Sequence, residues 1–394
     1  MKNVKCLVSK FKEMFSKNPL IIRSPGRINL IGEHTDYNEG FVLPAAIDKN
    51  IFFVISPRDD KKCLLYAADL NDDFEFDLNN FCKSEKVWPN YLIGVVDQLK
   101  KSKLEIQGFN CVFGGDIPIG AGLSSSAAIE AGLAFALNEI FELNIEKINL
   151  VKLSQRAENE FVGVQCGIMD QFINIFGKEN KVLKLDCRTL EFEYYPFELN
   201  DLQIVLCDTQ VKHSLASGKY NARRTQCEEG VRILRKFNNK IHTLRDVDLE
   251  FLNSHRSELD PTIFKRCKYV LNENSRVDAS CRDLENGDFI SFGRRMYESH
   301  EGLRYEYEVS CKELDTLAEI ASNHEAVLGA RMMGGGFGGC TINLVKKDGL
   351  EDFKEKIEKK YFAHFGKSIK FYITRIESGT SIISEFEMNR ISNC

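Results

Sequence analysis

Residues 116–128 read Asp-Ile-Pro-Ile-Gly-Ala-Gly-Leu-Ser-Ser-Ser-Ala-Ala, and this stretch decides the fold. It follows a strand-like apolar run at 109–115 and leads into an alanine-rich helical pattern at 127–141. A glycine loop between a strand and a helix leaves backbone N–H groups free, and the helix dipole adds positive potential. The pattern therefore favours phosphate binding, and a serine-capped glycine turn without a ligand is the alternative.

Several familiar phosphate and nucleophile motifs are missing from the sequence. No GxxxxGK[ST] loop, HRD or DFG triplet, or GxSxG elbow occurs in the chain. Ser125 stands where a dinucleotide-binding loop would have its third glycine. The sequence thus excludes a P-loop enzyme, a protein kinase and a Rossmann-type dinucleotide site.

A second segment, residues 24–38, places four polar side chains around a core-like run, INLIG (28–32). These side chains are Arg27, Glu33, His34 and Asp36. Polar groups packed beside a core strand need partners, and a polyol ligand offers many hydroxyls. A surface turn with local salt bridges is the alternative.

Two further segments complete the set of candidate motifs. Residues 334–339 contain five glycines in six positions, which is costly for folding unless a backbone or a ligand approaches closely; a tight hairpin is the alternative. Residues 166–171 read CGIMDQ, so Asp170 falls in the first turn of a short helix expected at 168–176. A helix dipole stabilises a carboxylate there, although a purely structural aspartate is common at this position.

Composition and element pattern give a mixed α/β protein of 394 residues with a net charge of −5. Helices are also expected at 83–101, 146–161 and 219–236, and strands at 182–186, 203–207, 340–345 and 370–375. The acidic balance gives no reason to expect nucleic acid, and no apolar run is long enough to cross a membrane. Thirteen scattered cysteines without a CxxC pair indicate reduced thiols, so a cytoplasmic protein is predicted.

Taken together, these segments resemble the GHMP small-molecule kinase superfamily and, within it, the galactokinase family. The resemblance is carried by five motifs in the expected order: GRINLIGEHTDYN (26–38), PIGAGLSSSA (118–127), CGIMDQF (166–172), SLASGKYNARRTQCEE (214–229) and RMMGGGFGG (331–339). It implies an N-terminal lobe similar to ribosomal protein S5 over residues 1–195. It also implies a ferredoxin-like C-terminal lobe over 196–394, with the active site in the cleft between them.

The resemblance also implies roles for individual residues. Asp170 becomes the catalytic carboxylate that faces the C1 hydroxyl of the sugar, and Arg27 becomes its neighbour near the transferred phosphate. The implied sugar pocket consists of Glu33, His34, Asp36, Gly167, Asp170 and Tyr220. The implied ATP site consists of Trp88, Gly120, Ala121, Gly122, Leu123, Ser124, Ser125, Ser126 and Ala127. Ser126 and Glu158 match the positions associated with Mg²⁺, and Trp88 has a core aromatic as its alternative role.

The implied activity is transfer of phosphate from ATP to the C1 hydroxyl of D-galactose, with Mg²⁺ as cofactor. An N-acetylgalactosamine kinase and a non-catalytic galactose- and ATP-binding sensor are the alternatives. Both Ser126 and Ala127 are present, so the serine loop has the catalytic length. A monomer without nucleic-acid or membrane partners is expected.

Overall fold

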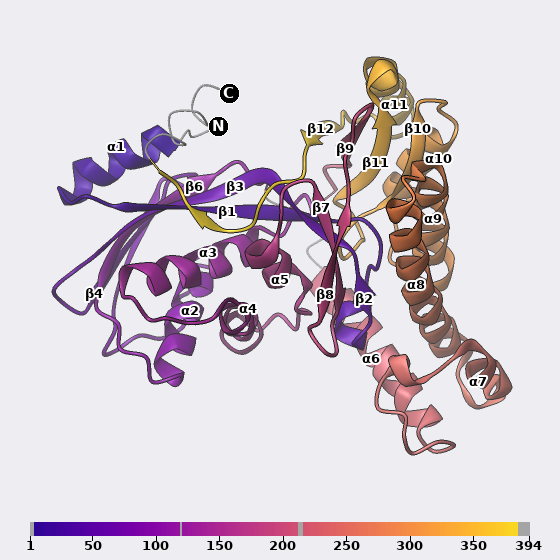
Figure 1. Ribbon diagram of the computed structural model, residues 1–394, viewed down its shortest axis with the longest axis horizontal. Coiled ribbons are helices and arrows are strands. Elements are labelled where there is room, and N and C mark those ends of the chain that lie inside the picture. Colours follow the sequence, from indigo (N-terminus) through magenta and orange to yellow (C-terminus); the bar gives the residue numbers. More distant parts are fainter. Residues whose placement is uncertain (1–3, 119, 212–215, 385–394) are drawn as a thin grey trace.

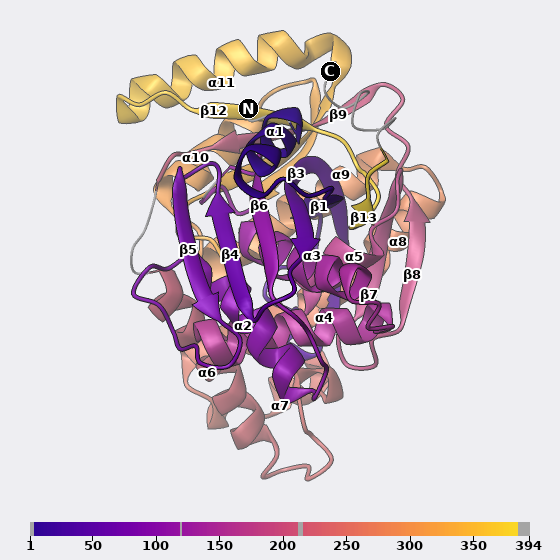
Figure 2. The ribbon, with the colours of Figure 1, turned by 90° about the vertical axis from the view of Figure 1, so that its left-hand side faces the viewer.

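The computed structural model describes residues 4–118, 120–211 and 216–384, which form two lobes (Figure 1). The first lobe contains a six-stranded sheet in the order β13-β1-β3-β6-β4-β5, whose long strands stand side by side in Figure 2. Its strands are β1 (Leu20–Asn29), β3 (Pro44–Pro57), β4 (Lys62–Ala67), β5 (Asp72–Asp77), β6 (Phe109–Gly115) and β13 (Ser381–Ile382).

Helices cover both faces of this sheet because both faces are apolar. Ile22 and Phe53 belong to the main core on the side of the larger helices, whereas Ile21 and Phe52 pack against α1 (Val4–Phe15). The helices of the larger layer are α2 (Pro89–Lys101), α3 (Ser125–Ile140), α4 (Lys147–Arg156) and α5 (Met169–Phe176).

Two helix boundaries differ from the sequence-based expectation. The helix expected from residue 83 begins at Pro89, because a proline at the first helical position starts a helix. The helix expected over 146–161 ends at Arg156 and continues as a wider turn, η2 (Ala157–Val162). Strand β1 runs on through Pro25, where a bulge in its pairing with β3 accommodates the proline.

The second lobe contains a four-stranded antiparallel sheet in the order β10-β11-β9-β12. Successive side chains of strand β9 point to opposite faces of this sheet. Ile204 and Leu206 pack into the main core, whereas Val205 and Cys207 pack against α11. Its strands are β9 (Leu202–Asp208), β10 (Val327–Met332), β11 (Cys340–Lys346) and β12 (Lys370–Thr374). Its helices are α6 (Ala216–Leu234), α7 (Leu249–Ser254), α8 (Pro261–Glu285), α9 (Phe289–Glu301), α10 (Lys312–Ser322) and α11 (Leu350–Phe365).

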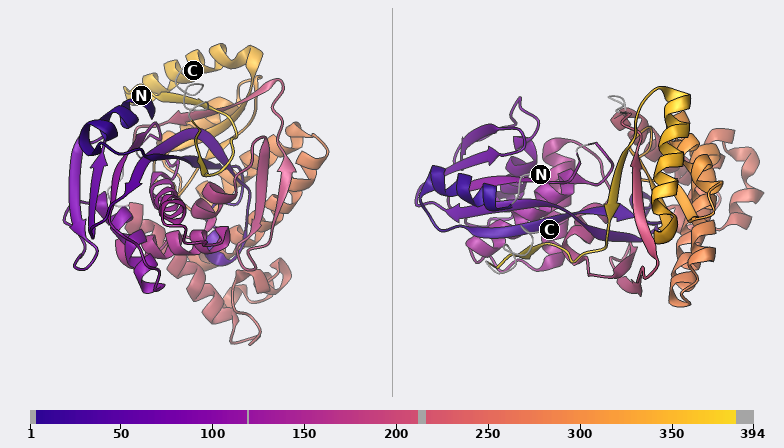
Figure 3. Two further views of the ribbon diagram at one scale, coloured as in Figure 1. Left: turned by 60° about the vertical axis from the view of Figure 1, so that its left-hand side comes forward. Right: turned by 90° about the horizontal axis from the view of Figure 1, so that it is seen from above.

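A small third sheet lies where the chain passes from one lobe to the other. It pairs β2 (Phe41–Val42), β7 (Lys181–Asp186) and β8 (Phe192–Pro196). The division into 1–195 and 196–394 stays a prediction, and its boundary falls at the end of β8. The C-terminal segment runs back along the first lobe, where β13 pairs with β1 (Figure 3).

The predicted class, a two-lobed α/β protein, is confirmed by this architecture. Every cysteine in the described ranges is a free thiol, and Cys394 lies outside them. Among the helices described, none combines the length and apolar character that crossing a bilayer requires.

Candidate active site

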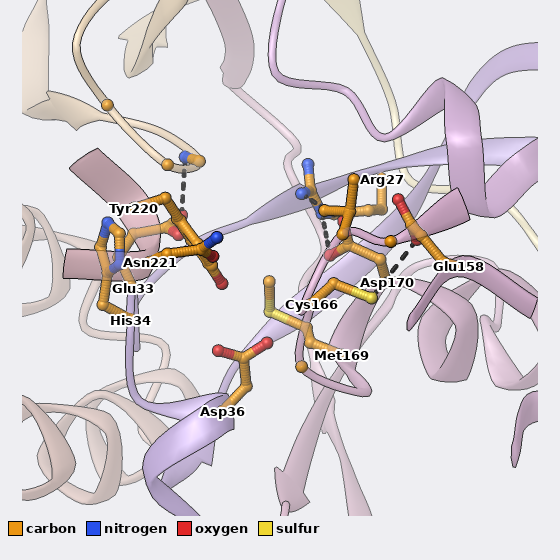
Figure 4. Close-up of a pocket in the computed structure, with 16 residues that line it drawn as sticks. Arg27, Glu33, His34, Asp36, Glu158, Cys166, Met169, Asp170, Tyr220 and Asn221 are labelled. Atoms are coloured by element: carbon orange, nitrogen blue, oxygen red, sulfur yellow. Dashed lines mark hydrogen bonds and ion pairs between the residues drawn. The ribbon is translucent and has the colours of Figure 1, made fainter. Parts of the chain in front are cut away.

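A cavity of about 320 Å³ lies between the lobes and gathers all of the predicted sugar-pocket residues together with Arg27 and Glu158 (Figure 4). The first lobe contributes its floor and the second lobe its opposite wall. The lining residues are Arg27, Glu33, His34, Asp36, Glu158, Gly163, Val164, Cys166, Gly167, Met169, Asp170, Tyr220, Asn221 and Gly334, Gly335 and Gly336.

A bidentate salt bridge joins Arg27 to Asp170 in this cavity. Arg27 Nε donates to Asp170 Oδ1 at 2.6 Å, and Nη2 donates to Oδ2 at 2.7 Å. Asp170 is placed there by the first turn of α5, and Arg27 by the bulge in β1. Burial opposes the charge of Arg27, but the Asp170 carboxylate outweighs it, so the pKa of Arg27 is raised. Because the planar guanidinium bonds to both carboxylate oxygens, the two side chains are fixed in one relative orientation.

The glycine–serine loop is tied to the same pair. Ser124 Oγ donates to Asp170 Oδ2 at 2.6 Å, and the guanidinium of Arg27 donates to the Gly122 carbonyl. Ser124 has a left-handed backbone (φ 57°), which turns the chain into α3. One of the three loop serines therefore positions Asp170, and Ser125 and Ser126 begin the helix.

The start of α3 lies beside this pair. The helix has 16 residues, so its first-turn N–H groups carry the full positive end of the dipole. Ser126 lies in that turn near Glu158, whose pKa is raised because burial and the charge of Asp170 outweigh the opposing effect of the Ser126 hydroxyl. This geometry suits phosphate oxygens that arrive next to Arg27.

A cluster of buried polar groups surrounds Glu158. Gln171 Nε2 donates to Glu158 Oε2 at 2.8 Å and to Glu130 Oε2 at 3.4 Å. Burial and the neighbouring acidic side chains raise the pKa values of Glu130 and Glu158 above their ordinary range. Cys166 Sγ donates to Glu158 Oε2 at 3.4 Å.

The donor set fits Mg²⁺ bound together with a nucleotide. The described residues contain no group of three or more His, Cys, Asp or Glu side chains that could hold a metal alone. The Ser126 hydroxyl and the Glu158 carboxylate offer two oxygens near the start of α3. Mg²⁺ typically takes one or two protein ligands and completes its shell with phosphate oxygens and water.

On the opposite side of the cavity, Glu33 is held by the second lobe. Its Oε1 accepts from Arg331 Nη2 at 2.9 Å and from the Gly334 N–H at 3.0 Å. Glu33 is 3% exposed and Arg331 is 0% exposed, so the pair is desolvated. The pair leaves Glu33 Oε2 available for a ligand.

Asp36 and Gly167 form the base of the cavity. A Cβ at Gly167 would lie 1.8 Å from Asp36 Oδ2, so only glycine allows this approach. Burial, followed by the charge of Asp170, raises the pKa of Asp36 to about 7. The carboxylates of Asp36 and Asp170 thus line the same cavity, which suits a ligand with several hydroxyls.

The glycines of 334–339 are explained by close backbone contacts. A Cβ at Gly336 would lie 2.2 Å from the Val309 carbonyl oxygen, and Gly336 has a left-handed φ of 78°. The loop also touches the first glycine loop, since a Cβ at Gly122 would lie 3.4 Å from the Met333 carbonyl oxygen. The expected close approach is therefore made by backbone, and the loop joins the two lobes above the cavity.

Trp88 lies away from this cavity. Its Nε1 donates to Asp72 Oδ2 at 2.9 Å, and its ring packs against Phe74 and Phe113. It precedes α2 and is half-buried. Its contact with adenine stays a prediction.

Sequence reasoning missed several residues of the site. Arg331 begins a quoted motif, but a role in holding Glu33 could not be read from one chain. Asn221 and Met169 line the cavity and adjoin the predicted Tyr220 and Asp170. Glu130 gave a usable signal, because a carboxylate interrupts the apolar face of the helix at 127–141. Residues 214 and 215 of the fourth motif lie outside the described residues.

The chain matches three family profiles. It matches "Galactokinase galactose-binding signature" over residues 9–57, "GHMP kinases N terminal domain" over 90–178 and "GHMP kinases C terminal" over 281–364. The match over 9–57 includes the segment that supplies Arg27, Glu33, His34 and Asp36.

Curated relatives are similar over nearly the whole chain. A galactokinase of Thermotoga petrophila is 42% identical, covering 92% of this chain and 99% of its own length. A galactokinase of Clostridium beijerinckii is 41% identical, covering 96% and 99%. A galactokinase of Roseiflexus sp. is 39% identical, covering 96% and 97%.

Solved structures agree with the sequence relatives. The crystal structure of Lactococcus lactis galactokinase complexed with galactose superposes with a TM-score of 0.92 at 37% identity, covering 96% of this chain and 100% of that one. Methanococcus jannaschii mevalonate kinase shares the fold, with a TM-score of 0.65 at 19% identity over 91% of this chain and 99% of that one. The two-lobed fold with its interlobe site defines the GHMP class of small-molecule kinases. Within that class, the chain belongs to the galactokinase family.

Proposed function

We infer that this chain transfers the terminal phosphate of ATP to the C1 hydroxyl of D-galactose, giving galactose 1-phosphate and ADP. The observation that carries this conclusion is the fork between Arg27 and Asp170 beside the start of α3, in a cavity lined by polar side chains. The galactokinase names of the relatives identify the sugar.

The site geometry suits phosphoryl transfer. The reaction passes through a loose transition state, so catalysis is mainly positioning and neutralisation of charge. Asp170 would orient the C1 hydroxyl and accept its proton late in the transfer. Arg27 and Ser124 fix the carboxylate for this task. The guanidinium would also neutralise charge on the transferred phosphate.

The nucleotide would lie along the glycine–serine loop, Gly120–Ala127, with its phosphates at the start of α3. Backbone N–H groups and the helix dipole would bind the phosphate oxygens. Ser126 and Glu158 would hold Mg²⁺, which when bound would neutralise phosphate charge. Trp88 remains the proposed neighbour of adenine.

The sugar would occupy the side of the cavity formed by Glu33, His34, Asp36, Gly167 and Tyr220. Its hydroxyls would pair with the carboxylates and the imidazole. A site built around a hydroxyl in one configuration rejects the epimer, because its buried polar groups would lose their partners. Glucose, the C4 epimer, should therefore be a poor substrate.

The two alternative functions gain no support. The relatives quoted carry the name galactokinase, and none is named as an N-acetylgalactosamine kinase or a sensor. The intact serine loop and the Arg27–Asp170 pair provide machinery that a sensor would not need. Cytoplasmic location, a monomeric state and the lack of nucleic-acid partners stay predictions.

A test of this function is ADP release with Mg-ATP and a panel of acceptors. The panel contains galactose, glucose, N-acetylgalactosamine, mevalonate and homoserine. We expect strong turnover with galactose and weak or no turnover with the others. Equal rates with glucose would overturn the specificity argument. Galactose binding without ADP release would instead indicate a sensor.

A further inference from the structure

A chain of hydroxyl groups leads from the second lobe to His34. Tyr37 OH lies 2.7 Å from His34 Nδ1, and Tyr307 OH lies 2.8 Å from Tyr37 OH. Cys227 Sγ lies 3.3 Å from Tyr307 OH and is the next group in this series. His34 and Tyr37 belong to the first lobe, and the other two residues to the second.

The other ring nitrogen of His34, Nε2, is buried within a residue that lines the cavity. His34 is 4% exposed, and its Nε2 has no hydrogen-bond partner in the described structure. Burial lowers the pKa of His34 to about 3, against a smaller opposing effect of the Gly335 backbone, so the ring is neutral. A buried polar atom of this kind needs a hydrogen-bond partner that the described residues do not supply.

The direction of the chain follows from the strengths of its donors and acceptors. A neutral imidazole has one N–H donor and one bare nitrogen. A phenol O–H is a better donor than an imidazole N–H, and a bare imidazole nitrogen is a better acceptor than a phenol oxygen. The favoured order therefore runs from Cys227 S–H to Tyr307, from Tyr307 to Tyr37 and from Tyr37 to His34 Nδ1. The single proton of His34 is then on Nε2.

We propose that Tyr37 and Tyr307 are positioning residues that fix His34 as the Nε2–H tautomer, so that it donates a hydrogen bond to an oxygen of the bound sugar. The proposal rests on the proposed function, in which His34 contacts galactose. It assigns a hydrogen-bond acceptor to that position of the ligand.

Backbone geometry shows that the arrangement is built rather than accidental. His34 has a left-handed backbone (φ 61°), a strained conformation for a residue with a side chain. Asn38 Nδ2 donates to the His34 carbonyl at 2.9 Å. On the other lobe, Arg223 Nε donates to the Tyr307 carbonyl at 2.7 Å. His34 and Tyr307 are therefore each held by a hydrogen bond to their backbone carbonyl.

The test compares Tyr37→Phe and Tyr307→Phe with the parent chain. Selective ¹⁵N labelling of histidine gives few signals, since the chain has seven histidines, and His34→Asn assigns the His34 signal by its loss. In the ligand-free parent, the ring shifts should report a proton on Nε2 and a bare Nδ1. In Tyr37→Phe, the tautomers should mix. Galactose KM should rise about three- to tenfold, the equivalent of one hydrogen bond, with kcat within about twofold of the parent.

Tyr361→Phe is the matched control. It removes another buried phenol hydroxyl, which donates to the Thr209 carbonyl at 3.1 Å in the second lobe. We expect it to leave the His34 signal and galactose KM unchanged. Thermal unfolding of each variant shows whether it is folded, and the tautomer measurement needs no substrate.

The outcomes distinguish the positioning role of Tyr37 and Tyr307 from the proposed contact of His34 with galactose. A proton on Nδ1 in the ligand-free parent would overturn the inference. An unchanged tautomer and an unchanged KM in both tyrosine variants would also overturn it. If His34→Asn leaves galactose KM unchanged while the tautomer depends on Tyr37, the chain of hydroxyls exists but the proposed sugar contact is wrong. A KM increase in Tyr37→Phe that disappears in the His34→Asn background would support the inference.

Discussion

At the scale of single residues, the orientation of Asp170 depends on two neighbours with different roles. Arg27 contacts both carboxylate oxygens, whereas Ser124 contacts only Oδ2, at 2.6 Å. In Ser124→Ala, we expect kcat to fall about tenfold because one hydrogen bond to a charged group is lost. Galactose affinity should be retained, since the fork with Arg27 remains. Initial rates and calorimetric binding of galactose measure the two effects, and an unchanged kcat would contradict the role of Ser124.

Asp36 gives a pH-dependent prediction. Its pKa is about 7 in the folded protein, against an ordinary value of 3.8, because of burial and the charge of Asp170. Between these values the folded chain binds a proton that the unfolded chain lacks, so this residue lowers stability as pH rises from about 4 to about 7. Asp36→Asn should therefore flatten this part of the stability curve and raise the free energy of unfolding at pH 8. Urea titrations at several pH values test it. Asp59→Asn, at a fully exposed side chain, is the control, and identical curves for the parent and Asp36→Asn would contradict it.

At the scale of elements, the glycine loop at 334–339 should tolerate a side chain at Gly335 but not at Gly336. Gly336 has a left-handed backbone and would place a Cβ 2.2 Å from the Val309 carbonyl oxygen. Gly336→Ala should cost about 1–3 kcal/mol of stability and weaken ATP binding, because the loop must move. Gly335→Ala is the matched control, since its Cβ would meet only the Tyr220 ring at 3.4 Å. Similar unfolding midpoints for both variants would contradict this account.

Many of the helices and strands could be predicted because the local periodicity of apolar residues indicates them. The helix at 127–141 and the strands at 109–115 and 340–345 appear within two residues of their predicted bounds. The two-residue strand β13 could not be predicted, because its pairing with β1 is long-range and leaves no local pattern. The cluster of Arg27, Glu33, His34, Asp36 and Asp170 was predicted from motif resemblance. The hydroxyl chain through Tyr307 was not, because it joins residues 270 positions apart in sequence.

At the scale of the whole molecule, Arg331 connects the lobes. This fully buried side chain of β10 donates to the Leu30 carbonyl at 2.7 Å and to Glu33 Oε1 at 2.9 Å. Arg331→Met would leave the Glu33 carboxylate buried without its cationic partner, which costs about 3–5 kcal/mol. Urea unfolding measures this loss. Arg375→Met, at a 71% exposed side chain, should cost less than about 0.5 kcal/mol, and equal losses in the two variants would contradict the role of Arg331.

The central claim is that Asp170, held by Arg27, acts on a sugar bound in the interlobe cavity. The most direct measurement is single-turnover formation of galactose 1-phosphate by Asp170→Asn, together with calorimetric binding of galactose. The amide keeps the shape of the side chain but cannot accept the proton from C1. We predict that turnover is abolished while galactose still binds. A variant that keeps more than a tenth of the parent rate would contradict the role of Asp170 as a proton acceptor.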